Sequence, residues 1–130
     1  MLNFLQPWSA QLLGLLRIVS GLLFIQHGTA KFFGVPISMG EVSVLSLYGV
    51  AGTLEIVGGA LFIIGLCTRP VAFVLSGFCA FAYFLGHASK GPVPLVNGGE
   101  LAIVWCFMFL YYAAAGAGAW SVDAMRARSA

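Results

Sequence analysis

Six polar side chains in this sequence of 130 residues are spaced so that they could meet at one site. They are His27, His87, Glu100, Asn97, Tyr83 and Lys31. Histidine exchanges protons near neutral pH, and a neighbouring carboxylate can fix which ring nitrogen carries the proton. These residue types therefore suit a polar binding site for a small molecule, a quinone head group or a proton path. The alternatives are a hydrogen-bonded network that only closes one end of the fold, and haem or metal ligation by the two histidines.

Two further charges lie inside apolar stretches, at Arg17 and Glu55. A charge near the middle of a bilayer costs about 2.5–3.5 kcal/mol on insertion scales, so each needs a partner. At 1.5 Å per helical residue, they lie roughly 10 Å and 16 Å from the same side of the membrane, a difference that an arginine side chain can span. We therefore predict a buried ion pair between them. The alternative is that Arg17 reaches the membrane interface while Glu55 is protonated.

The composition indicates that these polar groups belong to a membrane protein. Apolar residues make up 61% of the chain and charged residues 8%, whereas a soluble domain is about half apolar and about a quarter charged. A net charge of +2 is too small for a nucleic-acid surface. Three cysteines without a CxxC spacing supply neither a disulfide framework nor a zinc site. We expect the lipid bilayer as a partner, no nucleic acid and no bound metal.

Four apolar runs predict helices over about 10–33, 43–66, 70–87 and 98–119, followed by a tail over 120–130. Each run has roughly the 17–25 residues that a helix needs to cross a hydrocarbon core of ~30 Å. The short connections favour antiparallel neighbours. The sequence thus predicts an all-α fold, a single domain over 1–130 that forms an antiparallel bundle of four transmembrane helices.

The basic residues indicate an orientation for this bundle. Arg69, Arg126 and Arg128 fall on the side of the two termini, and Lys31 and Lys90 fall on the other side. Because cytoplasmic loops carry an excess of basic residues, we expect both termini in the cytoplasm. Both histidines then lie roughly 26 Å from the cytoplasmic side, so the polar site is expected near the extracytoplasmic face.

Four motifs in the sequence resemble those of the DoxX family, and together they cover essentially the whole chain. They are Arg17-x3-Gly21-x2-Phe24-x2-His27-Gly28-x2-Lys31, Glu55-x2-Gly58-Gly59-x-Leu61-x3-Gly65-Leu66-x-Thr68-Arg69, Ala82-Tyr83-Phe84-x2-His87 and Asn97-Gly98-Gly99-Glu100-Leu101. The resemblance implies a small multi-pass protein of four helices in the bacterial inner (plasma) membrane. It also implies a link to quinone-linked oxidoreductases and to defence against redox stress.

From the residues and the resemblance we predict a membrane subunit of a quinone-linked oxidoreductase system, without independent activity. The alternative is a non-enzymatic membrane protein, either an assembly partner or a small transporter. The expected partners are other oxidoreductase subunits or a second copy of this chain. The residues do not specify a cofactor; the candidates are quinone and, less favoured, haem held by His27 and His87. A transporter would need a continuous polar path from Arg17 through Glu55 to His27.

Overall fold

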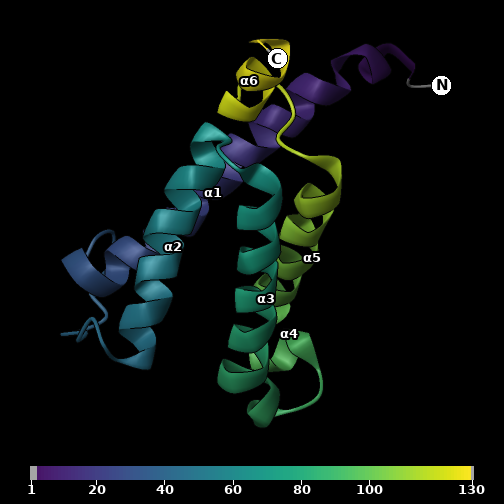
Figure 1. Ribbon diagram of the computed structural model, residues 1–130. Coiled ribbons are helices and arrows are strands. Elements are labelled where there is room, and N and C mark those ends of the chain that lie inside the picture. The colour runs from purple at the N-terminus through teal and green to yellow at the C-terminus, as the bar shows by residue number, and fades with distance from the viewer. Residues whose placement is uncertain (1–2, 130) are drawn as a thin grey trace.

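The computed structural model describes residues 3–129, and every regular element in that range is helical. The four long helices are α1 (Ser9–Phe33), α2 (Leu47–Ile64), α3 (Thr68–Gly86) and α5 (Glu100–Ala115). The short elements are α4 (Pro94–Asn97), α6 (Val122–Ser129) and two 3-10 helices, Asn3–Trp8 and Ala88–Lys90. The beginning and the end of the chain lie at the same end of the molecule (Figure 1).

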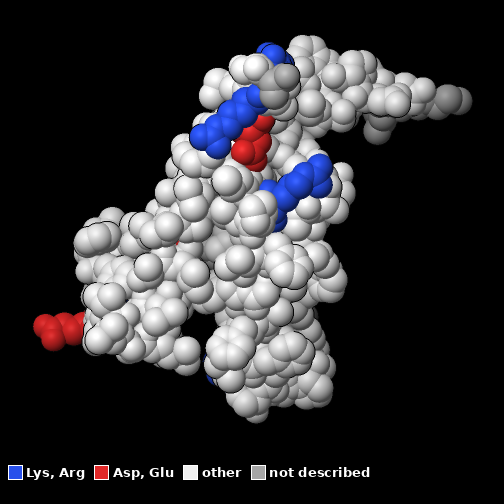
Figure 2. Space-filling view, in the orientation of Figure 1, with Lys and Arg blue, Asp and Glu red and all other residues white. Residues whose placement is uncertain are grey.

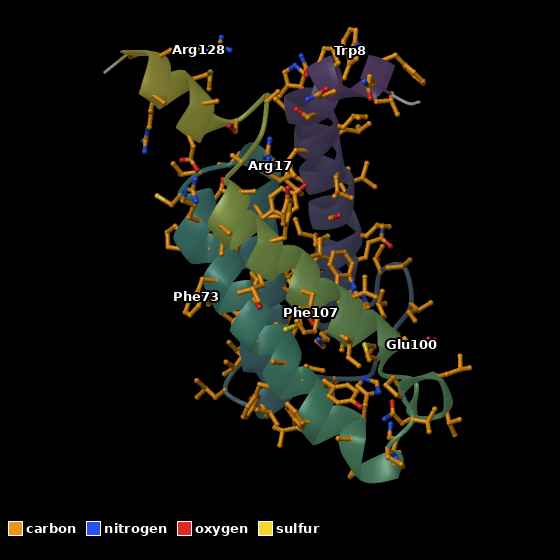
Figure 3. All side chains as sticks on the ribbon, turned by 90° about the vertical axis from the view of Figure 1, so that its right-hand side faces the viewer. Trp8, Arg17, Phe73, Glu100, Phe107 and Arg128 are labelled. Atoms are coloured by element: carbon orange, nitrogen blue, oxygen red, sulfur yellow. The ribbon has the colours of Figure 1, made fainter. Side chains whose placement is uncertain are left out.

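Three helical stretches are long and apolar enough to cross a membrane: Asn3–Phe33, Leu47–Ile64 and Thr68–Lys90. Helix α5 is also apolar but has 16 residues. Large apolar side chains cover the outside of these helices, as Figure 3 shows for Phe73 and Phe107, which are 66% and 65% exposed. Such a surface suits a hydrocarbon solvent and not water. The chain is therefore a multi-pass membrane protein.

Two helices are shorter than the apolar runs that predicted them, because local backbone chemistry sets their ends. Helix α2 begins at Leu47 and not at residue 43, since the Ser46 hydroxyl caps it by accepting from the Gly49 N–H at 3.1 Å. Helix α5 ends at Ala115 and not at residue 119. Gly116 and Gly118 follow with φ of 89° and 68°, left-handed values that glycine adopts without strain and that end a helix.

The segment predicted as a tail contains helix α6, which Asp123 fixes to the start of α3. Its carboxylate accepts from the N–H groups of Cys67 at 2.9 Å and Thr68 at 2.7 Å, and its own N–H donates to the Gly65 carbonyl at 2.9 Å. Burial raises the pKa of Asp123, but these hydrogen bonds and the charge of Arg126 outweigh burial and hold that pKa below its usual value. A carboxylate suits the first turn of a helix, where N–H groups lack partners.

The long helices form two pairs, α1 with α2 and α3 with α5 (Figure 1). Glycines set the close approach within the first pair. A Cβ atom added to Gly28 would lie 2.7 Å from the carbonyl oxygen of Gly52, and one added to Gly21 would lie 3.3 Å from that of Gly59. Small residues of this kind let two helix backbones pack closely in a membrane.

Aromatic rings form the core where the two pairs meet. Phe24 of α1 and Phe62 of α2 pack edge-to-face on Phe109 of α5, with ring centroids 5.0 and 4.9 Å apart. Tyr112 and Trp105 extend this layer along α5, at 4.9 Å from Phe62 and 5.2 Å from Phe24. Beyond this layer the pairs diverge, and Figure 2 shows an opening between α2 and α3 at the end away from the termini.

Candidate functional site

Arg17 is fully buried near the end of the molecule that carries the termini (Figure 3), where backbone carbonyls hold its charge. Its guanidinium donates five hydrogen bonds, to the carbonyl oxygens of Phe62, Ile63, Ala117, Ala119 and Trp120. The last carbonyls of a helix lack partners inside it and form the negative end of its dipole, so they suit a cation. Arg17 therefore ties α1 to the end of α2 and to the connection between α5 and α6.

The predicted ion pair between Arg17 and Glu55 does not form, because Glu55 pairs with Lys31. The Lys31 Nζ lies 2.5 Å from each carboxylate oxygen of Glu55, and these side chains are only 10% and 7% exposed. Helices α1 and α2 run in opposite directions, and a side chain leans toward the N-terminus of its own helix. Lys31 and Glu55 consequently lean toward each other, whereas Arg17 leans away from Glu55.

Three of the six predicted site residues come together where α3 ends, namely Tyr83, His87 and Asn97. The Nδ1 atom of His87 lies 3.1 Å from the carbonyl oxygen of Asn97, and the rings of Tyr83 and His87 stack with centroids 6.4 Å apart. The Asn97 amide, which is buried, donates to the Gly91 carbonyl at 2.8 Å and to the Tyr83 hydroxyl at 3.4 Å. Its oxygen accepts from the Gly99 N–H at 2.8 Å. Asn97 is thus the centre of this group.

Among residues 3–129, the other predicted residues make no hydrogen bond to these three. His27 is exposed on α1, with its ring 6.5 Å from that of Phe24. Glu100 is exposed at the start of α5 (Figure 3). Within residues 3–129 no three His, Cys, Asp or Glu side chains are grouped so that they could hold a metal ion. The structure therefore divides the predicted site between the two helix pairs.

The opening in Figure 2 separates these helix pairs. His27, Lys31 and Glu55 belong to the helices on one side of it, and Tyr83, His87 and Asn97 to the elements on the other. An apolar groove of about 360 Å³ lies between α2 and α3 and is lined by Thr53, Leu54, Val57, Gly58, Leu61, Pro70, Val71, Val74 and Leu75. A second cavity, of about 350 Å³, lies at the end of the molecule that carries the termini, beside Arg69 and Asp123, and shares Pro70 with this groove. Neither is lined by the six predicted residues.

Trp105 is a candidate that the sequence analysis missed. Its side chain is 8% exposed, and its buried indole N–H has no hydrogen-bond acceptor among the residues that the structure describes. It packs against Phe24, which in turn lies beside His27. In the sequence, Trp105 is one of several aromatic residues in an apolar run, so only the burial of its N–H distinguishes it.

The protein consists of apolar helices that bury Arg17, Lys31 and Glu55 between them. It therefore belongs to the class of helical multi-pass membrane proteins with buried ionisable groups. Within it the chain belongs to the DoxX family, because the family model DoxX matches residues 12–88, as the motifs predict. An uncharacterised protein of Haemophilus influenzae is 48% identical over 129 residues, 94% of this chain and 96% of the relative. The putative oxidoreductase CatD of Bacillus subtilis is 33% identical over 101 residues, 68% of this chain and 75% of the relative. No solved structure matches significantly.

Proposed function

We propose that this protein is a membrane subunit of a quinone-linked oxidoreductase system, and that it binds the quinone head group at the opening between its helix pairs. One observation carries this proposal. The buried Lys31–Glu55 pair belongs to one helix pair, the Tyr83–His87–Asn97 group belongs to the other, and an opening separates the two pairs. Membership of the DoxX family and similarity to a putative oxidoreductase support a redox role by analogy.

The polar side chains fit the chemistry of such a ligand. A bound quinone supplies electron transfer that is coupled to the gain or loss of protons, and its oxygens accept hydrogen bonds. Lys31 and Tyr83 carry donors, and the histidine rings can hold or release a proton near neutral pH. Glu55 keeps Lys31 in place at 2.5 Å. In a site with little water these hydrogen bonds are stronger than they are at a protein surface.

The groove between α2 and α3 supports a lipid-soluble ligand. Two of its lining residues, Val57 of α2 and Val74 of α3, are each 54% exposed, so the groove lies at the outer surface of the helices. An apolar tail can lie along it while the head group reaches the opening. A transporter has less support, because the aromatic layer of Phe24, Phe62 and Phe109 lies between Arg17 and the opening.

We further propose that α5 is the fourth transmembrane helix of an antiparallel bundle in the bacterial inner (plasma) membrane, with both termini in the cytoplasm. The 16 residues of α5 fall just short of the roughly 17 that a spanning helix needs. Charged side chains gather around α6 and the start of α3, on the side that the positive-inside rule assigns to the cytoplasm (Figure 2). The opening then faces the extracytoplasmic side.

Quinone content tests the proposal. The protein is extracted into lipid nanodiscs directly from membranes, and quinone per chain is measured by mass spectrometry against the surrounding lipid. We expect enrichment with the native chain and loss of that enrichment with Tyr83→Phe and His87→Gln. Lys90→Ala, which changes an exposed side chain at the same end, is the matched control and should keep it. Quinone at the level of the bulk lipid would overturn the proposal, and partner proteins co-purifying without quinone would favour an assembly role.

A further inference from the structure

We propose that the indole N–H of Trp105 donates a hydrogen bond to a carbonyl oxygen of the bound ligand. This inference rests on the proposed function and deepens it, because it names the residue that selects a ligand with a carbonyl group. Trp105 lies outside the residues 12–88 that the family model matches. Neither its residue type nor its spacing from other polar residues identifies Trp105 as a site residue in the sequence.

The first argument is the unpaired donor. A buried tryptophan N–H usually has a hydrogen-bond partner, and a buried polar atom without one requires an explanation. The Trp105 side chain is 8% exposed, and its Nε1 atom has no acceptor among residues 3–129. A ligand that supplies an acceptor oxygen gives this N–H its hydrogen-bond partner. The indole nitrogen only donates, so it cannot be satisfied by another donor or by the hydrocarbon tail of a lipid.

The second argument is the position of the ring. Helix α5 begins at the open end of the molecule, and Trp105 is the first of its three buried aromatic residues, ahead of Phe109 and Tyr112. Its ring stacks on Phe109 at 5.6 Å and lies 5.2 Å from Phe24, whose ring is 6.5 Å from that of His27. Trp105 therefore lies at the end of the aromatic core that is nearer the open end of the molecule, with one ring, Phe24, between it and His27.

The third argument concerns access. The Nε1 atom is covered by protein atoms, so a ligand reaches it only when a neighbouring ring turns aside. Phe78 of α3 packs edge-to-face on Phe24 at 6.2 Å and is only partly buried, which makes it the ring at the margin of this layer. A planar ring that enters here is surrounded by aromatic side chains, which favour stacked and edge-to-face contacts.

Tryptophan fluorescence tests the inference directly, because the chain has three tryptophans and the other two are exposed far from this site. Trp8 and Trp120 are 58% and 63% exposed at the end of the molecule that carries the termini. A Trp8→Phe/Trp120→Phe variant leaves Trp105 as the single emitting tryptophan. Titration with a short-chain benzoquinone in nanodiscs is expected to quench its emission to saturation. Quenching that rises linearly with quinone, as random collisions produce, would overturn the inference.

A second variant tests the hydrogen bond itself. Trp105→Phe keeps an aromatic ring but removes the N–H, and equilibrium dialysis with the same benzoquinone is expected to show binding about tenfold weaker. The melting temperature without quinone should fall only by the packing lost with the smaller ring, because no hydrogen bond is lost. Phe107→Leu, at an exposed aromatic residue of the same helix, is the control and should bind normally. Equal binding by Trp105→Phe and the native chain overturns this inference alone, whereas no binding by the native chain overturns the proposed function as well.

Discussion

Neutralising Glu55 is expected to destabilise the contact between α1 and α2 strongly. The Lys31 Nζ lies 2.5 Å from each oxygen of the Glu55 carboxylate, and both side chains are at least nine-tenths buried. Glu55→Gln leaves the lysine charge buried without its partner. Breaking a buried ion pair in this way costs about 3–5 kcal/mol of unfolding free energy. The double variant Lys31→Met/Glu55→Gln leaves no charge unpaired and should recover most of that loss.

The assay is the free energy of unfolding in mixed micelles, measured for both single variants, the double variant and the native chain. The cycle is expected to give a coupling energy of at least about 3 kcal/mol between Lys31 and Glu55, because each single variant leaves the other charge buried without a partner. A matched cycle with Arg17→Met and Glu55→Gln should be additive within about 0.5 kcal/mol, because Arg17 donates to backbone carbonyls instead. A coupling near zero for Lys31, or a large one for Arg17, would refute this reasoning.

Two further predictions concern the helix contacts. Gly28→Val should destabilise the protein by about 1–3 kcal/mol, since its Cβ would lie 2.7 Å from the Gly52 carbonyl oxygen. Gly77→Ala, which meets nothing within 4 Å, should not destabilise it in the same unfolding assay. Asp123→Ala should cost about 0.5–2 kcal/mol at pH 7. Because folding lowers the Asp123 pKa, its contribution is present above the usual value of about 3.9 and is lost as the pH falls through the lowered pKa. If the unfolding free energy of Asp123→Ala fell at acid pH in the same way as that of the native chain, this role of Asp123 would be contradicted.

The existence of the helices follows from the sequence, but their ends and charge partners depend on features that an apolar run does not contain. The length of each run predicts a helix, whereas the start of α2 depends on the Ser46 hydroxyl and the end of α5 on glycine φ angles. The ion pair between Arg17 and Glu55 was predicted from the estimated depths of the two residues in the membrane. That prediction considered only side-chain partners, although backbone carbonyls at a helix end can also hold a cation.

The candidate site was predictable where its residues are local in sequence. Tyr83 and His87 are one helical turn apart, and Asn97 follows after a short connection, so the sequence brings them together. His27 and Glu100 were placed with them by depth alone, and depth does not fix which way a side chain points. Trp105 could not be recognised, because an unpaired N–H is a property of packing and not of residue type.

Photoaffinity labelling tests the central claim most directly, namely that the opening between the helix pairs holds a quinone head group. An azido-benzoquinone is photolysed with the protein in nanodiscs, and the labelled peptides are mapped by mass spectrometry. We predict labels that excess benzoquinone suppresses, on peptides of both helix pairs at this end, around His27 and Lys31 of α1 and around Tyr83 and His87 of α3. Labels that excess benzoquinone does not suppress, spread over the exposed apolar faces or gathered near Arg17, would contradict the claim.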